Sequence, residues 1–176
     1  RGEMLGFWSK VEEGTIPTRV THNDTKINNI LFDRQGEVLC AIDLDTVMAS
    51  TSLNDFGDAI RSYANTGDED DRDLSRVGLS LEMFRAYTEG YLSQRAKQLT
   101  DSEIDHLAFS ARYITFEQVL RFLMDYIDGD TYYKVKYPGH NLVRTHAQYR
   151  LLQSMEEHYG EMCRIVRETV DKYRKA

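Results

Sequence analysis

Apolar residues recur every three or four positions along most of this chain, which is the spacing of one face of an α-helix. The first such stretch contains Met4, Leu5, Trp8 and Val11 and stops at Gly14. We expect Trp8 to lie in the core, as most large aromatic residues do. The pattern predicts a largely helical protein, with further helical stretches over residues 56–63, 81–91, 104–126 and 142–170.

One segment has the pattern of β-structure. Two short apolar runs, residues 29–33 and 38–42, are joined by the turn-rich linker Arg34-Gln35-Gly36-Glu37, which is typical of a β-hairpin. No other stretch carries a convincing strand pattern, and the sequence contains no internal repeat. The predicted fold class is therefore mostly α with one small β-hairpin.

Polar residues indicate where the long helices begin and end. Thr100 and Glu103 have the spacing of a capping box, and Asp128-Gly129 should end the helix that follows, which is predicted to be buried for most of its length. We expect one last long helix after Gly139, with basic side chains near the negative end of its dipole. The acidic run at residues 68–73 is predicted to be a solvated loop, with a cation site as the alternative.

The composition is that of a single globular domain, residues 1–176. The chain has a mass of 20.5 kDa, and a chain of this size buries roughly two-thirds of the surface that its unfolded form exposes. Acidic residues exceed basic residues by 29 to 22, which gives a net charge of −7 and a pI of about 5.2. This charge argues against a general nucleic-acid binder. No apolar run approaches the ~20 residues that a membrane helix requires.

Cysteine usage and the first residues bear on location and completeness. Cys40 and Cys163 are the only cysteines and form no C-x-x-C pair, so neither a disulfide framework nor a zinc ribbon is indicated. We therefore expect a reducing cytoplasm. The chain opens Arg1-Gly2-Glu3, without an initiator methionine or the regions of a signal peptide. We expect it to be a piece of a larger protein.

Chemically informative residues lie on both sides of the predicted hairpin. Before it comes T-H-N-D-T-K-I-N-N, residues 21–29, and directly after it comes I-D-L-D, residues 42–45. The two outer ends of a hairpin lie side by side, so Asn29 and Asp43 should be neighbours, with Asp24 on the loop that leads in. Two oxygen donors beside a third carboxylate and a lysine are the groups that hold Mg²⁺ and a polyphosphate.

This arrangement resembles the catalytic loop of the protein-kinase-like fold, H-x-D-x-x-x-x-N, followed after two strands by a metal-binding Asp. His22, Asp24 and Asn29 occupy the three fixed positions, and Asp43 the metal-binding one. Without a Phe-Gly after Asp43, the chain is more similar to small-molecule kinases of the aminoglycoside phosphotransferase and choline kinase group. It resembles N-acetylhexosamine 1-kinases most closely, in T-H-N-D-T-K-x-N-N at 21–29, I-D-L-D-T-V-M at 42–48, D-F-G-D-A-I-R at 55–61, R-F-L-x-D-Y at 121–126 and Y-x-x-H-N-L-x-R at 137–144.

The resemblance implies the C-terminal lobe of an α+β kinase fold that uses ATP and Mg²⁺. In that family a smaller N-terminal lobe supplies a Gly-rich loop and a lysine that grip ATP, and neither motif is found here, so the isolated chain is expected to be inactive. Asp24 would be the catalytic base, Asn29 and Asp43 the metal ligands, and Lys26 would stabilise charge on the transferred phosphoryl group. The alternatives are a turn-capping aspartate, two residues that merely end strands, and a solvent-facing lysine.

Other residues near these motifs have roles that the resemblance leaves more open. His22 is expected to brace the loop backbone, with Asp55 as a partner, whereas Asp45 could contact a second metal ion or the sugar. Arg121 lies in a helix predicted to be buried, where a guanidinium needs an anionic or multiply hydrogen-bonding partner. The resemblance places Arg121 and Tyr132 in a sugar pocket. The alternatives are an internal ion pair and a core tyrosine.

The leading functional hypothesis is phosphorylation of the anomeric hydroxyl of an N-acetylhexosamine. The runner-up is the same chemistry on an aminoglycoside, choline or homoserine, and the non-enzymatic alternative is a kinase-like binding module. Zinc and hydrolase sites are not indicated, because the histidines lack ligand spacing and no nucleophile motif is present. We also expect an apolar seam where the N-terminal lobe would dock, and hence association of the chain into dimers.

Overall fold

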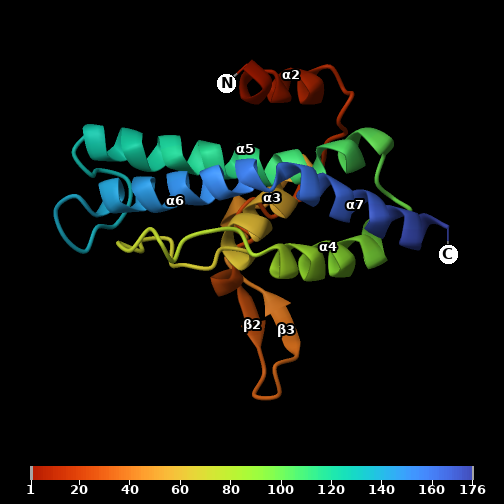
Figure 1. Cartoon of the computed structure of the whole chain (residues 1–176), viewed down its shortest axis with the longest axis horizontal. Coiled ribbons are helices and arrows are strands. Elements are labelled where there is room, and N and C mark those ends of the chain that lie inside the picture. Colours follow the sequence, from red (N-terminus) through yellow and green to blue (C-terminus); the bar gives the residue numbers. More distant parts are fainter. Residues whose placement is uncertain (1, 176) are drawn as a thin grey trace.

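One long helix, α5 (Asp101–Ile127), runs through the helical body of the computed structural model, which describes residues 2–175 (Figure 1). Thr100 and Glu103 form both bonds of the predicted capping box, and the helix ends at Asp128 as predicted. The chain is mostly helical, which confirms the predicted fold class. The other helices are α1 (Gly2–Leu5), α2 (Phe7–Glu12), α3 (Ser52–Tyr63), α4 (Leu81–Arg95), α6 (His140–Glu157) and α7 (Tyr159–Arg174).

Helices from distant parts of the chain build one apolar core around α5. Helix α5 packs against α3, α6 and α7, and α4 packs against α7. Figure 1 shows α6 and α7 following the line of α5 in the opposite direction. The crossing of α3 and α5 requires a glycine, because a Cβ on Gly57 would lie 2.5 Å from the carbonyl oxygen of Ser110. None of the helices in residues 2–175 is both long and apolar enough to cross a bilayer.

The predicted last long helix is two helices, α6 and α7, which meet at His158. The backbone there turns to φ −104° and ψ 8°. The carbonyl oxygen of Ser154 makes two hydrogen bonds to His158. One is to its backbone N–H at 3.1 Å, and the other is to its ring Nδ1 at 2.8 Å. Gly160, a poor helix former, follows two residues later. This shared carbonyl and the glycine account for the break.

The prediction that Trp8 lies in the core is wrong. Its side chain is 38 % exposed, whereas the neighbouring Phe7 is buried. Trp8 packs edge-on against Phe7 and Tyr113. Figure 1 shows α2 as an outer layer beside α5, so α2 has a helix to pack on along one face only. The side chain of Leu5, also placed on the apolar face of this stretch, lies outside the described residues.

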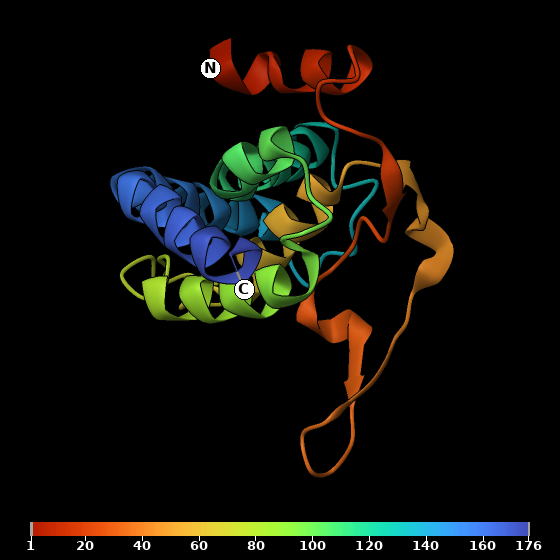
Figure 2. The ribbon, with the colours of Figure 1, turned by 90° about the vertical axis from the view of Figure 1, so that its right-hand side faces the viewer.

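The predicted hairpin is confirmed, and a second strand pair forms a separate small sheet. Strands β2 (Ile30–Phe32) and β3 (Val38–Ala41) pair antiparallel and project from the helical body in Figure 2. Strands β1 (Arg19–Thr21) and β4 (Met48–Ser50) form a further antiparallel pair that the sequence did not predict. Each of these strands has only three residues, too few for an alternating pattern to be recognised. Their pairing brings together the two chain segments that flank the hairpin.

A buried carboxylate ties β1 to α5. Glu103 is 0 % exposed and accepts bonds from Arg19 Nε at 2.6 Å and Nη2 at 2.7 Å. It also accepts bonds from Ser52 Oγ at 2.7 Å and from the N–H of Thr100 at 2.8 Å. Burial raises the pKa of Glu103, but the bonds from Arg19, Thr100 and Ser52 outweigh it and lower the pKa to about 2.

Replacement of Glu103 by glutamine should therefore destabilise the fold in a pH-dependent way. The pKa of Glu103 falls from 4.5 to about 2 on folding, so the charge stabilises the protein above about pH 4.5, and this contribution is lost as the pH falls toward 2. Removal of one partner of a buried pair costs about 3–5 kcal/mol, and the partial exposure of Arg19 places our expectation at the lower end. Urea unfolding of Glu103→Gln at pH 7 and near pH 2.5 measures the effect.

The matched control for this test is Asp105→Asn, which changes an exposed carboxylate on the same helix. It should unfold together with the parent protein at both pH values. Equal midpoints for Glu103→Gln and the parent at pH 7 would contradict a stabilising role for the pair.

Candidate active site

The loop of residues 21–29, called here the HND loop after His22-Asn23-Asp24, is clamped by a carboxylate from α3. Asp55 accepts the backbone N–H of His22 at 3.0 Å and that of Asn23 at 2.7 Å. Asn23 has a φ of 62°, a left-handed conformation in which asparagine is enriched. Burial raises the pKa of Asp55, and the two backbone bonds offset part of that increase. The main chain that leads to Asp24 is thereby held against α3.

His22 braces the loop, as the sequence predicts. Its ring Nε2 hydrogen-bonds to the carbonyl oxygen of Ile42 at 2.9 Å, and Thr46 Oγ1 donates to the carbonyl oxygen of His22 at 2.7 Å. The imidazole therefore joins the segment before the hairpin to the segment after it. Asp55 supports the same loop, but through the backbone rather than through the ring.

Asp24, Lys26 and Asn29 form one hydrogen-bonded group. Oδ2 of Asp24 accepts from Lys26 Nζ and from Asn29 Nδ2, each at 2.7 Å. The carbonyl oxygen of Asp24 also accepts from Asn29 Nδ2, at 2.9 Å. Burial lowers the pKa of Lys26, but the carboxylates of Asp24, Asp43 and Asp58 outweigh it, so the net shift is upward. Lys26 therefore stays protonated beside Asp24.

The hairpin brings Asp43 toward this group. The N–H of Ile42 donates to the carbonyl oxygen of Asn29 at 2.9 Å, so the outer ends of the two strands meet as the topology predicts. Asp43 follows at a left-handed turn with φ 63° and ψ 55°, and it is exposed. Its charge contributes to the raised pKa of Lys26. Asp45 is also exposed, in the short helix η2 (Leu44–Thr46), and its role stays open.

The oxygen donors of Asn29 and Asp43 fit a magnesium ion. Both bonds from Asn29 Nδ2 go to Asp24, which fixes the amide and leaves Oδ1 for a ligand. Mg²⁺ takes few protein oxygens and completes its shell with phosphate and water. Among residues 2–175, no three His, Cys, Asp or Glu side chains gather to hold a metal ion. An ion held by Asn29 and Asp43 would complete its shell with phosphate oxygens and water.

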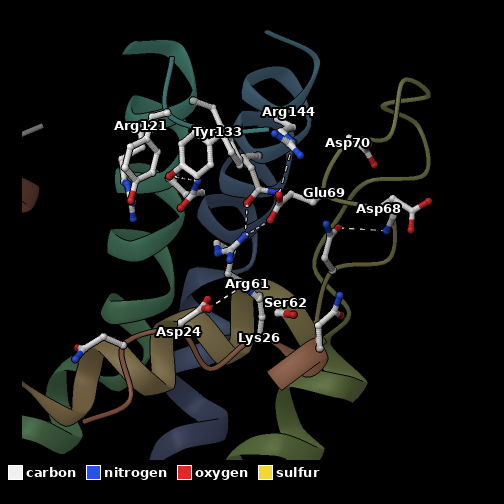
Figure 3. A pocket seen from close by; sticks show the side chains of 18 of the residues that line it. Asp24, Lys26, Arg61, Ser62, Asp68, Glu69, Asp70, Arg121, Tyr133 and Arg144 are labelled. Atoms are coloured by element: carbon white, nitrogen blue, oxygen red, sulfur yellow. Dashed lines mark hydrogen bonds and ion pairs between the residues drawn. The ribbon is translucent and has the colours of Figure 1, made fainter. Parts of the chain in front are cut away.

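A cavity of about 880 Å³ opens beside the HND loop, with Asp24 and Lys26 in its lining (Figure 3). Arg121 and Tyr132 also line it. Neither is buried: Arg121 is exposed, and Tyr132 is 74 % exposed. The prediction that α5 buries Arg121 is wrong, because α5 has 27 residues and its partner α3 has 12, so the last turns of α5 extend past α3. The guanidinium lies 5.8 and 5.6 Å from the ring centres of Tyr132 and Tyr133.

A buried arginine from α3 forms the floor of the cavity. Arg61 is 6 % exposed and donates to Asp58 Oδ1 at 2.8 and 3.0 Å and to Glu69 Oε2 at 2.9 Å. It also donates to Gln148 Oε1 at 3.4 Å. Burial lowers the pKa of Arg61, but Asp58 and Glu69 outweigh it and the net shift is upward. Figure 3 shows Arg61 between Asp24 and Glu69, with Arg144 above.

The acidic segment at residues 68–73 is not simply a solvated loop. Asp70 accepts from His140 Nε2 at 2.8 Å and from Lys136 Nζ at 3.0 Å. The bond with His140, followed by that with Lys136, lowers the pKa of Asp70 to about 2. Together with the Glu69–Arg61 pair, these bonds hold the segment at the edge of the cavity, which Glu69 and Asp70 line. These pairs could not be predicted, because a series of acidic residues does not indicate which distant basic residues it contacts.

Two cavity residues, Arg61 and Arg144, and their neighbours Asp58 and His140 lie in distinctive sequence segments. Asp58 and Arg61 belong to the D-F-G-D-A-I-R segment, and His140 and Arg144 belong to Y-x-x-H-N-L-x-R. Both segments resemble those of a kinase family, but spacing along the chain does not indicate a role for these four residues. A charged residue at an otherwise apolar helix position is the signal that could have identified Arg61.

The HND loop, the hairpin and Asp55 all lie in a part of the chain that matches a known protein family. The model described as the phosphotransferase enzyme family matches residues 7–91. This match supports placing the chain in the aminoglycoside phosphotransferase and kinase-like superfamily. The helical body with its small hairpin agrees with the C-terminal lobe of that superfamily's fold. The catalytic and binding roles of individual residues stay predictions.

Loss of the Asp55 clamp should loosen the HND loop before it unfolds the protein. In Asp55→Asn one oxygen becomes an NH₂ donor that faces a backbone N–H, which costs about 1–3 kcal/mol. We expect a lower urea midpoint and faster amide hydrogen exchange at His22 and Asn23, with Asp105→Asn as the control. Unchanged exchange at these two amides would show that the clamp does not hold the loop.

Proposed function

We propose that this chain carries the catalytic base, metal ligands and acceptor cavity of a cytoplasmic, ATP- and Mg²⁺-dependent kinase that phosphorylates the anomeric hydroxyl of an N-acetylhexosamine. The observation that carries the proposal is Asp24, held at the lining of a polar cavity and hydrogen-bonded to Lys26 and Asn29. The family match over residues 7–91 supports phosphotransfer in general. The acceptor and the cofactors are our inference.

In this mechanism Asp24 accepts the proton of the acceptor hydroxyl. As it does so, the sugar oxygen bonds to the γ-phosphorus of ATP, the bond from that phosphorus to the β–γ bridging oxygen breaks, and ADP leaves. Lys26 stays protonated beside Asp24 and stabilises charge on the transferred group. When bound at Asn29 and Asp43, Mg²⁺ would neutralise charge on the phosphates. The backbone clamp at Asp55 keeps the base in place.

Most of the charged groups in the cavity are paired, which supports an uncharged, polar acceptor. Arg61 is neutralised by Asp58 and Glu69, and Lys136 is paired with Asp70. Arg121 lines the cavity and is exposed, so its N–H groups can donate to carbonyl or hydroxyl oxygens of a ligand. Acyl-amino sugars offer several such oxygens.

The aromatic residues of the cavity favour a sugar over choline. A quaternary ammonium binds to the open faces of aromatic rings. The guanidinium of Arg121 already lies over the rings of Tyr132 and Tyr133, at 5.8 and 5.6 Å. A second cation at these rings would be repelled by Arg121. The arginine is instead available to donate hydrogen bonds to acceptor oxygens.

The hairpin surface supports a further part of the proposal. Val38 and Leu39 of β3 are 64 and 62 % exposed, and exposed apolar groups of this kind mark interaction sites. We infer that a nucleotide-binding lobe packs on this apolar surface. Chains without that lobe would expose the surface and associate into dimers through it.

Asp24→Asn in the full-length protein should lower kcat by about 10²- to 10⁴-fold, because the variant loses the base but keeps a hydrogen-bond acceptor for Lys26. We expect its thermal unfolding to match that of the parent and its acceptor KM to stay similar. ADP release measured with saturating ATP and N-acetylglucosamine checks this. Near-normal turnover would remove Asp24 from the mechanism, while Asp105→Asn should turn over normally.

A panel of acceptors tests the substrate class. We expect kcat/KM for N-acetylglucosamine or N-acetylgalactosamine to exceed that for choline, homoserine and an aminoglycoside by at least about 10²-fold, because a site built for substrate hydrogen bonds rejects ligands that leave its buried groups unpaired. The 1-deoxy sugar should release no ADP. Preference for an amino alcohol would overturn the sugar assignment but leave a kinase.

A further inference from the structure

We propose that Asp125 is a positioning residue, which holds the Tyr132–Tyr133 segment as a wall of the acceptor cavity and so sets acceptor affinity without contacting the acceptor. This inference rests on the proposed function of the cavity. Asp125 lies near the end of α5, is 6 % exposed, and does not belong to the lining of the cavity beside the HND loop. Its carboxylate is directed toward the chain that follows the helix.

Both oxygens of Asp125 accept backbone bonds from that chain. Oδ1 accepts the N–H of Tyr132 at 2.8 Å, and Oδ2 accepts the N–H of Tyr133 at 3.0 Å. Oδ2 also accepts Nδ2 of Asn141, the second residue of α6, at 2.8 Å. One buried carboxylate therefore connects the end of α5, the intervening loop and the start of α6.

The loop after α5 has no regular structure that would hold these two tyrosines. Helix α5 ends at Ile127 with Asp128 as its cap, and the chain reverses through left-handed residues, Gly129 with φ 88° and Asp130 with φ 59°. Between residues 130 and 138 there is neither a helix nor a strand. Backbone N–H groups in such a segment need partners other than a ladder or a helical turn. Asp125 supplies those partners.

The same group of bonds also reaches Arg144 on α6, a further residue of the cavity lining. Asn141 Nδ2 donates to Asp130 Oδ1 at 2.8 Å, and Asn141 Oδ1 accepts from Arg144 Nη1 at 2.9 Å. Arg144 lines the cavity, as do the two tyrosines. Tyr133 is further held by Gln118, which donates to its hydroxyl at 3.2 Å. Displacement of Asp125 would thus shift the two tyrosines and Arg144 together.

The test compares Asp125→Asn with the parent in the full-length protein. The variant turns one acceptor oxygen into a donor that faces an N–H. We expect amide hydrogen exchange at Tyr132 and Tyr133 to become at least about 10-fold faster. KM for N-acetylglucosamine should rise about 10- to 100-fold, since a small misplacement of a binding wall has effects of that size. KM for ATP should not change, and Asp105→Asn should match the parent in all three measurements.

Each outcome decides the inference. Unchanged exchange at both tyrosines would overturn it, and so would faster exchange with an unchanged acceptor KM. If Asp125→Asn fails to fold, Asn141→Ala carries the test. It removes one bond to the carboxylate, together with the bonds of Asn141 to Asp130 and Arg144, and leaves both backbone bonds. The faster exchange at Tyr132 and Tyr133 should then appear at smaller size, and unchanged exchange at both would overturn the inference. A parent protein inactive on N-acetylhexosamines would overturn the proposed function instead, and hydrogen exchange would still decide whether Asp125 holds this segment.

Discussion

The two backbone bonds that Asp55 accepts from His22 and Asn23 are the constraint on which the candidate site depends. The HND loop has no ladder of its own between β1 and β2, so its geometry comes from the helix that it touches. That helix, α3, is held close to α5 by the glycine contact at Gly57. The packing of α3 in the core therefore sets the position of Asp24, because the Asp55 carboxylate holds the loop that carries it.

The same device recurs at two other places in the molecule. Glu103 receives a backbone N–H, a hydroxyl and an arginine where β1 meets α5, and Asp125 receives two backbone N–H groups where the chain leaves α5. All three carboxylates lie on helices, and each holds a chain segment that has few backbone hydrogen bonds of its own. The net charge of −7 thus does not come from surface residues alone, because these three acidic side chains hold parts of the backbone in place.

The parts of the site that could be predicted are those set by short stretches of chain. The hairpin pattern placed Asn29 near the residue that precedes Asp43, and the capping box located the start of α5. The environment of Arg121 could not be predicted, because apolar spacing does not indicate where the long helix α5 extends past the shorter α3. The pairing of β1 with β4 was missed for a related reason, since each strand is too short to show a pattern and the contact spans the hairpin.

The sequence alone thus determined the helices, the hairpin and the order of chemical groups along the HND loop, because these depend on hydrogen bonds and turns within a few residues. Only the tertiary structure decided which charged groups meet. Arg61 contacts Glu69 and Gln148, and His140 contacts Asp70 across 70 positions of sequence. Such pairs form because helix packing brings distant segments to one cavity, where burial requires every charge to find a partner.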